Sequence, residues 1–268
     1  MTLEIRLLSE TYRTALLPGA VVIGLFFGSF LNCTAMRIVR GQDWVRERSR
    51  CPACGHVLSA LDLIPIAGFL IRRGKCAWCG GKISLRYPVT ELLFAGITGL
   101  VVWKTGLSIN TIRYFIFACS LYVLSLTDME ARRIPNGCLF TALVGWLVTE
   151  PWLFRGWTDL CWHIAAMIGC SLAVLCLSLI MDRVLKKESL GGGDVKLIAL
   201  LGLYLGVVGT MFALFFASVL GILYAAVKGK LGRGQVIAFG PFLAAAGFVM
   251  AVAGEGLVAR YMGLLTGW

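Results

Sequence analysis

The sequence contains few charged residues and very little histidine. Asp, Glu, Lys and Arg make up only 15% of its 268 residues, whereas 59% are hydrophobic and the mean hydropathy is +0.84. This composition excludes a soluble globular domain and predicts a protein that crosses a membrane several times. Because the chain has only two histidines, a catalytic triad built on histidine is disfavoured. Any chemistry is therefore expected from other side chains.

Acidic residues are scarcer than basic ones, 14 against 25, so the formal net charge is +11. Such an excess is also typical of nucleic-acid-binding proteins. If the apolar segments alternate across a membrane, however, 19 of the 25 basic residues fall on one side, in loops 37–86, 128–136, 182–196 and 228–236. The positive-inside rule assigns that side to the cytoplasm. The charge thus indicates topology, and no nucleic-acid partner is predicted.

The first apolar stretch, residues 15–36, is not followed closely by the small residues typical of signal-peptide cleavage. We therefore expect this stretch to be a first membrane-spanning helix. We predict an all-α polytopic membrane protein with about seven or eight transmembrane helices. Its expected parts are an N-terminal segment with the first transmembrane helix over 1–40, a cytoplasmic zinc-binding lobe over 41–88, and a transmembrane core over 89–268.

Glycines mark two features of the predicted spans. Gly24 and Gly28 recur at helical spacing in the first span, a pattern of small residues that favours close helix–helix contact. The apolar stretch 197–227 is too long for one perpendicular helix, and Gly206 and Gly209 within it indicate a break. We expect two short spans there.

The ten cysteines divide into two groups. Six lie in or beside apolar spans, where single thiols behave as small hydrophobic groups. The other four form two Cys-x-x-Cys-Gly units in the cytoplasmic loop, at Cys51, Cys54, Cys76 and Cys79. The two-residue gap lets both sulfurs of a pair reach one ion, and the glycine permits the turn that follows. Because paired units in a reducing compartment indicate metal rather than disulfides, we predict a structural four-cysteine Zn²⁺ site.

A triple glycine, Gly191-Gly192-Gly193, precedes Asp194 at the mouth of the apolar stretch 195–227. Consecutive glycines allow positive φ angles and let another peptide approach the backbone closely. An ionisable residue where water gives way to hydrocarbon is costly, so its default interpretation is functional. The alternative is structural: a glycine-rich loop in which Asp194 is the N-cap of the next helix.

Two further carboxylates lie near the same membrane boundary. Asp128 follows the apolar stretch 112–126 and is expected on the same side as Asp194, at matching depth. Glu91 lies near the start of the second span, where the helix dipole favours a carboxylate, so a structural role is preferred for it. Two carboxylates held together cannot both ionise, so one can act as base toward a water while the other, protonated, polarises a carbonyl. Asp128 and Asp194 are therefore the candidate catalytic pair for peptide hydrolysis.

Five motifs in this order resemble those of type IV prepilin peptidases. They are the two Cys-x-x-Cys pairs, Asp128 with Ile134-Pro135-Asn136 after it, the Gly-x-Gly-Asp unit 191–194, and the Phe-Gly-Pro-Phe block 239–242. The resemblance covers almost all of the chain after residue 20. It implies an enzyme that removes the short basic leader from type IV prepilins or type II secretion pseudopilins, at the cytoplasmic face of the bacterial inner membrane. The family's catalytic pair maps onto Asp128 and Asp194.

The resemblance also implies supporting residues and a second activity. The residues expected to support the carboxylates or contact substrate are Gly191, Gly192, Gly193, Lys196, Pro135, Asn136, Gly240 and Pro241. Pro241 is expected to kink the last span near the cytoplasmic face. Many relatives also methylate the new N-terminal residue with S-adenosylmethionine. Gly74 and Lys75 precede Cys76 in the region that the family links to methylation, and they are the candidate residues for that cofactor.

Other functions are weighed against this one. A proton-coupled transporter would use Asp128 and Asp194 as a proton relay, but it predicts carboxylates near mid-span. A membrane-anchored zinc scaffold would use the two aspartates as helix caps, but it leaves the triple glycine unexplained. A peptidase without methyltransferase activity is a further alternative within the same family.

Overall fold

The computed structural model describes residues 3–43, 48–186, 190–229 and 237–266. Parts of three predicted basic loops, 44–47, 187–189 and 230–236, lie outside these residues. The described residues are mostly helical and contain two isolated β-bridges but no β-strand. The all-α class predicted from sequence is confirmed. The chain divides into two compact units, Met1–Thr111 and Ile112–Trp268.

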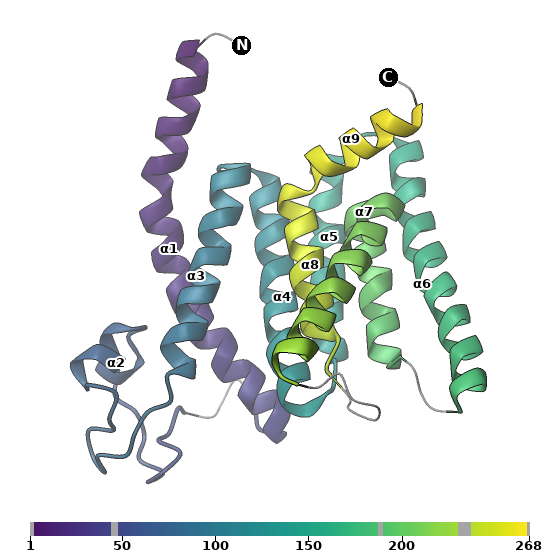
Figure 1. Cartoon of the computed structure of the whole chain (residues 1–268). Coiled ribbons are helices and arrows are strands. Elements are labelled where there is room, and N and C mark those ends of the chain that lie inside the picture. The colour runs from purple at the N-terminus through teal and green to yellow at the C-terminus, as the bar shows by residue number, and fades with distance from the viewer. Residues whose placement is uncertain (1–2, 44–47, 187–189, 230–236, 267–268) are drawn as a thin grey trace. The chain divides into compact units, whose positions relative to one another are not determined.

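The first unit is built on two long helices, α1 (Leu3–Arg40) and α3 (Arg86–Thr105), which pack against each other (Figure 1). Glycines allow this close contact. A Cβ atom at Gly24 would lie 2.7 Å from the Ala95 Cα, and one at Gly28 would lie 3.0 Å from the Phe94 Cβ. Because larger side chains do not fit at these approaches, the predicted contact role of Gly24 and Gly28 is confirmed.

Between α1 and α3 lies a small lobe with little regular structure. Its helical elements are the 3₁₀-helix η1 (Leu61–Leu63) and the short α-helix α2 (Ala67–Ile71). Each of its two β-bridges flanks one Cys-x-x-Cys unit, Arg50 with Val57 and Lys75 with Lys82. A lobe with such short elements buries little apolar surface, so other contacts have to stabilise it.

The second unit is a bundle of helices. Their bounds are α4 (Ile109–Ala131, beginning at the end of the first unit), α5 (Asn136–Leu153), α6 (Trp157–Leu185), α7 (Gly192–Val227), α8 (Gly240–Ala253) and α9 (Glu255–Thr266). Helix α7 contacts α5, α6 and α8. At one such contact Gly202 faces the Ala166 carbonyl oxygen, 2.7 Å from where a Cβ would be. The Tyr204 ring of α7 also stacks on Phe117 of α4, with ring centroids 3.9 Å apart.

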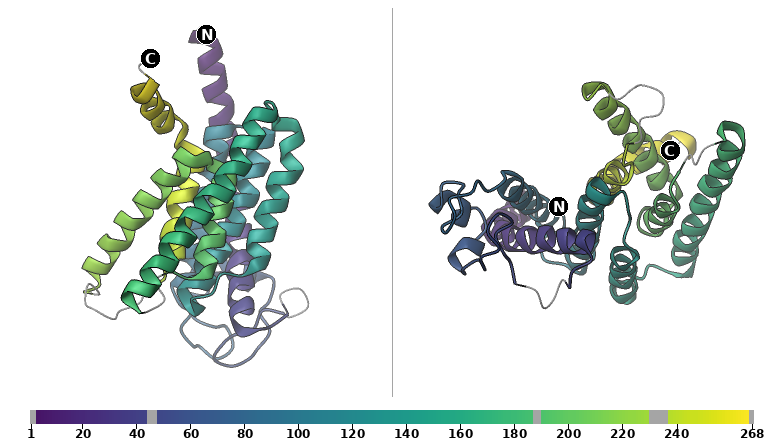
Figure 2. Two further views of the ribbon diagram at one scale, coloured as in Figure 1. Left: turned by 90° about the vertical axis from the view of Figure 1, so that its right-hand side faces the viewer. Right: turned by 90° about the horizontal axis from the view of Figure 1, so that it is seen from below.

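Helix α7 reverses its direction at Gly206. This residue has φ 68° and ψ −176°, a backbone conformation outside the helical region that glycine adopts readily. The two arms of α7 diverge from this point, and their open ends lie toward the same end of the unit (Figure 1). Figure 2 shows the divergence from the side and from below. The break predicted from Gly206 is confirmed.

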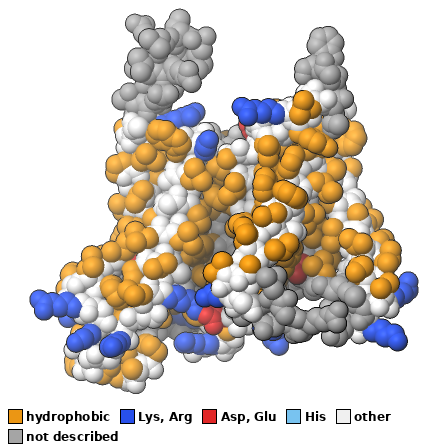
Figure 3. Space-filling view, in the orientation of Figure 1, with side chains coloured by type: hydrophobic (Ala, Val, Ile, Leu, Met, Phe, Trp, Pro, Cys, Tyr) orange, Lys and Arg blue, Asp and Glu red, His pale blue; other side chains and the backbone are white. Residues whose placement is uncertain are grey.

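Within the described residues, four helical segments are long and apolar enough to cross a membrane: Tyr12–Arg40, Ile109–Ala131, Trp157–Val184 and Gly192–Val227. The pair α8 and α9, bent by 78°, makes a fifth if it is one span. This number is below the predicted seven or eight. Helices α3 and α5, which hold two predicted spans, are not in the group. Helix α3 carries Arg86, Glu91 and Lys104, and α5 carries Asn136, Glu150 and Pro151. Helix α7 counts once despite its reversal. On each unit, hydrophobic side chains cover the middle of the helices and basic ones lie toward the ends (Figure 3).

Candidate active site and cysteine cluster

Asp128 lies in the last turn of α4. Its side chain is buried, and its Oδ2 atom has no hydrogen-bond partner among the described residues. The chain leaves the helix just beyond it through Arg132, whose φ of 51° is unusual for a residue other than glycine. A buried carboxylate oxygen without a partner is costly, and such groups are rare unless they serve a function.

Asp194 lies in the first turn of α7. The helix begins at Gly192 and its N-cap is Gly191, so the alternative that Asp194 is the N-cap is wrong. The Asp194 backbone N–H donates to the Gly191 carbonyl oxygen at 3.0 Å. The Asp194 Oδ1 atom is buried and, like Asp128 Oδ2, has no partner within the described part of the chain. The two carboxylates are close enough to repel each other electrostatically.

Two glycines bring the carboxylate-bearing helix ends together. A Cβ atom at Gly240, the first residue of α8, would lie 2.6 Å from Asp128 Oδ2. A Cβ atom at Gly193 would lie 2.9 Å from the Cβ of Ile134, whose Cδ1 also lies 3.5 Å from the Cβ position of Gly240. Ile134 therefore packs against both glycines, and a side chain at Gly193 would displace it. The sequence motifs contained Ile134, but our candidate list did not, because an isoleucine carries no chemical signal.

The predicted supporting residues also meet here. Lys196 Nζ donates to Asn136 Oδ1 at 3.0 Å, which ties the start of α7 to the start of α5. Pro135 is the N-cap of α5. Pro241 lies in the first turn of α8, where its missing N–H costs no helical hydrogen bond. The expected kink at Pro241 is therefore wrong, because α8 begins beside the proline instead of continuing through it.

This arrangement can bind and activate water. Two carboxylates from different helices each present a buried oxygen that has no partner among the described residues, and neighbouring charges make it unfavourable for both to ionise. One proton shared by the pair leaves one acid and one base on the same site. Water bound at these free oxygens would give them hydrogen-bond partners.

The four cysteines of the lobe come together as predicted. Their sulfur atoms all lie within 4.8 Å of one another, with Cys51 and Cys79 4.0 Å apart. A tetrahedral Zn²⁺ ion about 2.3 Å from each thiolate would hold sulfurs about 3.8 Å apart, so the spacing fits. Backbone N–H groups of Cys79 and Trp78 lower the pKa of Cys76 to about 7, which favours the thiolate that a metal needs.

The glycines of the lobe have the backbone geometry that the motifs predict. Gly55 and Gly80, which follow the two pairs, have φ of 71° and 68°. Gly74 has φ 69°, and its Cβ position lies 3.0 Å from the Phe69 ring, so backbone geometry alone explains this glycine. Lys75 lies beside it on the bridge to Lys82, and its side chain is exposed.

Glu91 connects the lobe to the helices of the first unit. Its side chain is buried, and Oε2 accepts a hydrogen bond from the Ile66 backbone N–H at 2.8 Å. Ile66 has φ 59°, which is strained for a β-branched residue. The structural role preferred for Glu91 fits this contact, but the helix-dipole explanation does not, because Glu91 lies beyond the first turn of α3. The hydrogen bond holds the strained turn in place.

Two family models match the chain. The bacterial peptidase A24 N-terminal domain matches residues 22–105, and the type IV leader peptidase family matches residues 115–226. Curated proteins named prepilin leader peptidase/N-methyltransferase are similar over nearly the whole length. The one from Bacillus subtilis (strain 168) is 32% identical over 92% of this chain and 98% of its own length. The one from Neisseria gonorrhoeae is 30% identical over 89% of this chain and 91% of its own.

The chain therefore belongs to the type IV leader peptidase family. A further relative from Stutzerimonas stutzeri, with the same name, is 32% identical over 91% of this chain and 92% of its own length. No solved structure was found to match the chain.

Proposed function

We propose that the protein is an aspartic endopeptidase that removes the basic leader from type IV prepilins or type II secretion pseudopilins. Asp128 and Asp194 are its catalytic residues. The observation that carries this proposal is the pair of buried carboxylate oxygens without partners, one from each aspartate, at neighbouring helix ends. The names of the relatives, prepilin leader peptidase/N-methyltransferase, support the same reaction and substrate class.

Hydrolysis needs both protonation states of the pair. The ionised carboxylate accepts a proton from a bound water as the water oxygen attacks the scissile carbonyl carbon. The protonated carboxyl gives its proton to the carbonyl oxygen, forming a tetrahedral diol. When the diol collapses, the carbon–nitrogen bond breaks, the leaving amine takes the proton held by the first carboxylate, and one diol hydroxyl returns its proton to the second. The pair is then ready for another water.

The site is proposed to lie at the cytoplasmic face of the bacterial inner membrane. The basic loops that indicate the cytoplasmic side include 128–136 and 182–196, which bear the two aspartates. A basic leader stays on that side while the apolar segment after it enters the membrane. Carboxylates at helix ends therefore meet the peptide bond between the leader and the apolar segment. Their position at helix ends also disfavours a proton-coupled transporter, which needs carboxylates near mid-span.

A second activity is proposed on the same chain. The relatives' names include N-methyltransferase, and S-adenosylmethionine is the proposed methyl donor for the new N-terminal amine. Gly74 and Lys75 are the candidate residues for this cofactor. The four cysteines are proposed to hold a structural Zn²⁺ ion that orders the lobe around them. Each of these assignments has its own readout, methyl transfer for one and metal content for the other.

The test is cleavage of a purified prepilin by the purified protein in detergent. Asp128→Asn and Asp194→Asn keep the shape of each side chain but remove its acid–base chemistry, so each is expected to lower the cleavage rate on the order of 10³-fold or more. Asp159→Asn, in the first turn of α6, is the matched control and should cleave normally. Retained cleavage in either dyad variant would contradict the two-carboxylate mechanism. Product that is shortened but not methylated would support the peptidase without the methyltransferase.

A further inference from the structure

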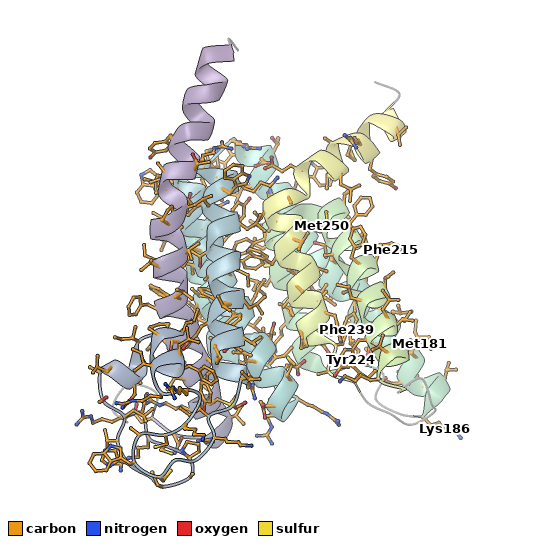
Figure 4. All side chains as sticks on the ribbon, turned by 60° about the vertical axis from the view of Figure 1, so that its left-hand side comes forward. Met181, Lys186, Phe215, Tyr224, Phe239 and Met250 are labelled. Atoms are coloured by element: carbon orange, nitrogen blue, oxygen red, sulfur yellow. The ribbon has the colours of Figure 1, made fainter. Side chains whose placement is uncertain are left out.

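The second unit contains an apolar pocket that the proposed reaction has not used. Its volume is about 310 Å³, and it lies between the second arm of α7 and the start of α8. Gly221 and Ala225 of α7 line one wall, and Ile237, Phe239 and Phe242 line the other. Figure 4 shows Phe239 and Tyr224 at the same end of this unit. The pocket has no charged lining residue, and the Ser218 hydroxyl already donates to the Leu214 carbonyl oxygen.

The pocket and the carboxylate lie on either side of one short segment. Phe239, which lines the pocket, is the N-cap of α8 and directly precedes Gly240. Gly240 in turn approaches Asp128 so closely that a Cβ there would lie 2.6 Å from Oδ2. A peptide held with its scissile bond at the two aspartates therefore has side chains within reach of the pocket.

Resting on the proposed peptidase function, we infer that this pocket is a substrate subsite. It takes a bulky apolar side chain of the peptide on the carboxyl-terminal side of the scissile bond. The leader side is excluded, because burying a basic side chain among apolar groups without a partner is strongly unfavourable. Ligand pockets span roughly 300–1,000 Å³, so a pocket at the lower limit fits one or two side chains and not a whole helix.

Gly221 offers a way to fill the pocket without touching the carboxylates. A Cβ there would lie 3.7 Å from the Phe242 ring and 4.0 Å from the Phe239 ring, which is ordinary contact. Gly221→Ala is therefore tolerated, whereas the longer side chain of Gly221→Leu enters the pocket. Gly169→Leu on α6 is the matched control, because nothing lies within 4 Å of its Cβ position.

The experiment measures kcat/KM for a prepilin peptide and for versions in which each of the first four residues after the scissile bond is replaced by Ala. Gly221→Leu is expected to lower kcat/KM for the parent peptide about tenfold or more, since losing a side-chain contact in an apolar pocket has that size. Gly221→Ala and Gly169→Leu should stay near wild type. At one peptide position, Ala should lower the wild-type rate but leave the Gly221→Leu rate unchanged.

A second variant tests the opposite change. Ile222 lines the pocket and is largely exposed, so Ile222→Ala enlarges the pocket with little effect on folding. It is expected to improve cleavage of a peptide with Trp at the sensitive position relative to the parent. The subsite is wrong if Gly221→Leu cleaves every peptide like wild type. It is also wrong if Gly221→Leu slows cleavage of all peptides equally, which is the result expected if the new side chain only displaced a lipid chain. Either result leaves the proposed peptidase function intact. If the wild-type protein cleaves no peptide, the proposed function itself fails.

Discussion

The buried carboxylates of the two units differ in their hydrogen bonding. In the first unit, Glu91 Oε2 accepts the Ile66 N–H at 2.8 Å. In the second unit, Asp128 Oδ2 and Asp194 Oδ1 have no partner among the described residues. A buried carboxylate oxygen with a protein donor serves the fold, whereas one without a donor is left free to bind water or substrate. The comparison separates structural from candidate catalytic acids although all three lie near the ends of apolar helices.

The two units also differ in what stabilises them near these acids. The lobe of the first unit has only short helical elements and a cluster of four cysteines. The aspartates of the second unit lie on long helices that approach one another through glycines such as Gly193 and Gly240. Loss of metal should therefore affect the lobe, and added side-chain volume should affect the aspartate site.

Metal removal gives the largest expected effect. Structural Zn²⁺ sites contribute on the order of 10 kcal/mol to folding, so a strong chelator or Cys51→Ser should unfold the lobe. Backbone hydrogen exchange, followed by mass spectrometry, should rise sharply over residues 48–85 while the first arm of α7 stays protected. Cys161→Ser, at an exposed cysteine outside the cluster, is the control. Equal loss of protection in both units would contradict the idea that the metal stabilises only the lobe.

Added volume at Gly240 gives the next largest effect. In Gly240→Ala the new methyl group would overlap Asp128 Oδ2, so the carboxylate has to move. We expect prepilin cleavage to fall on the order of 10²-fold, the loss typical of misplaced catalytic groups. Gly137→Ala, near the start of α5 with nothing within 4 Å of its Cβ position, should keep its activity. Normal cleavage by Gly240→Ala would mean that this close approach is unimportant.

Substitution of Glu91 should affect stability more than catalysis. Glu91→Ala leaves the half-buried Ile66 N–H without an acceptor and should destabilise the first unit by about 2 kcal/mol. Glu91→Gln keeps an acceptor oxygen and should cost less. Thermal unfolding and exchange at the Ile66 amide measure the difference, and the cleavage rate of folded protein is the second readout. A Glu91→Gln variant that folds normally but cannot cleave would place Glu91 with the reactive acids instead.

Breaking the ion pair between Asp62 and Arg72 in the lobe gives the smallest expected effect. Hydrogen bonds from the Ser59 side chain, and then Arg72, lower the pKa of Asp62. The stabilisation that ionised Asp62 gives to the folded state is therefore complete at pH values above the ordinary carboxyl pKa of about 3.9. This stabilisation is lost as the pH falls below that value. At pH 7 the full contribution of this partly exposed pair is below about 1 kcal/mol. A double-mutant cycle with Asp62→Asn and Arg72→Gln measures it, and a coupling well above this limit would refute the estimate.

Local patterns in the sequence predicted much of this protein. The spacing of the Cys-x-x-Cys-Gly units predicted the metal-binding geometry, and the break at Gly206 followed from the length of the apolar stretch around it. Contacts between distant segments were harder to predict. Pro241 was expected to kink a helix that in fact begins beside it, and Ile134 gave no sign that it packs against two glycines. Both depend on where neighbouring helices end.

The sequence by itself determined the helical membrane class, the cysteine cluster and the chemical identity of the acids, because hydrophobic length and residue spacing act locally along the chain. Only the tertiary structure decided which carboxylate oxygens receive a hydrogen bond and which do not. Glu91 meets a backbone N–H from the lobe, whereas Asp128 faces a glycine of a helix much later in the chain. Hydrogen-bond satisfaction depends on which backbone groups the fold brings within about 3 Å, and no local pattern encodes that.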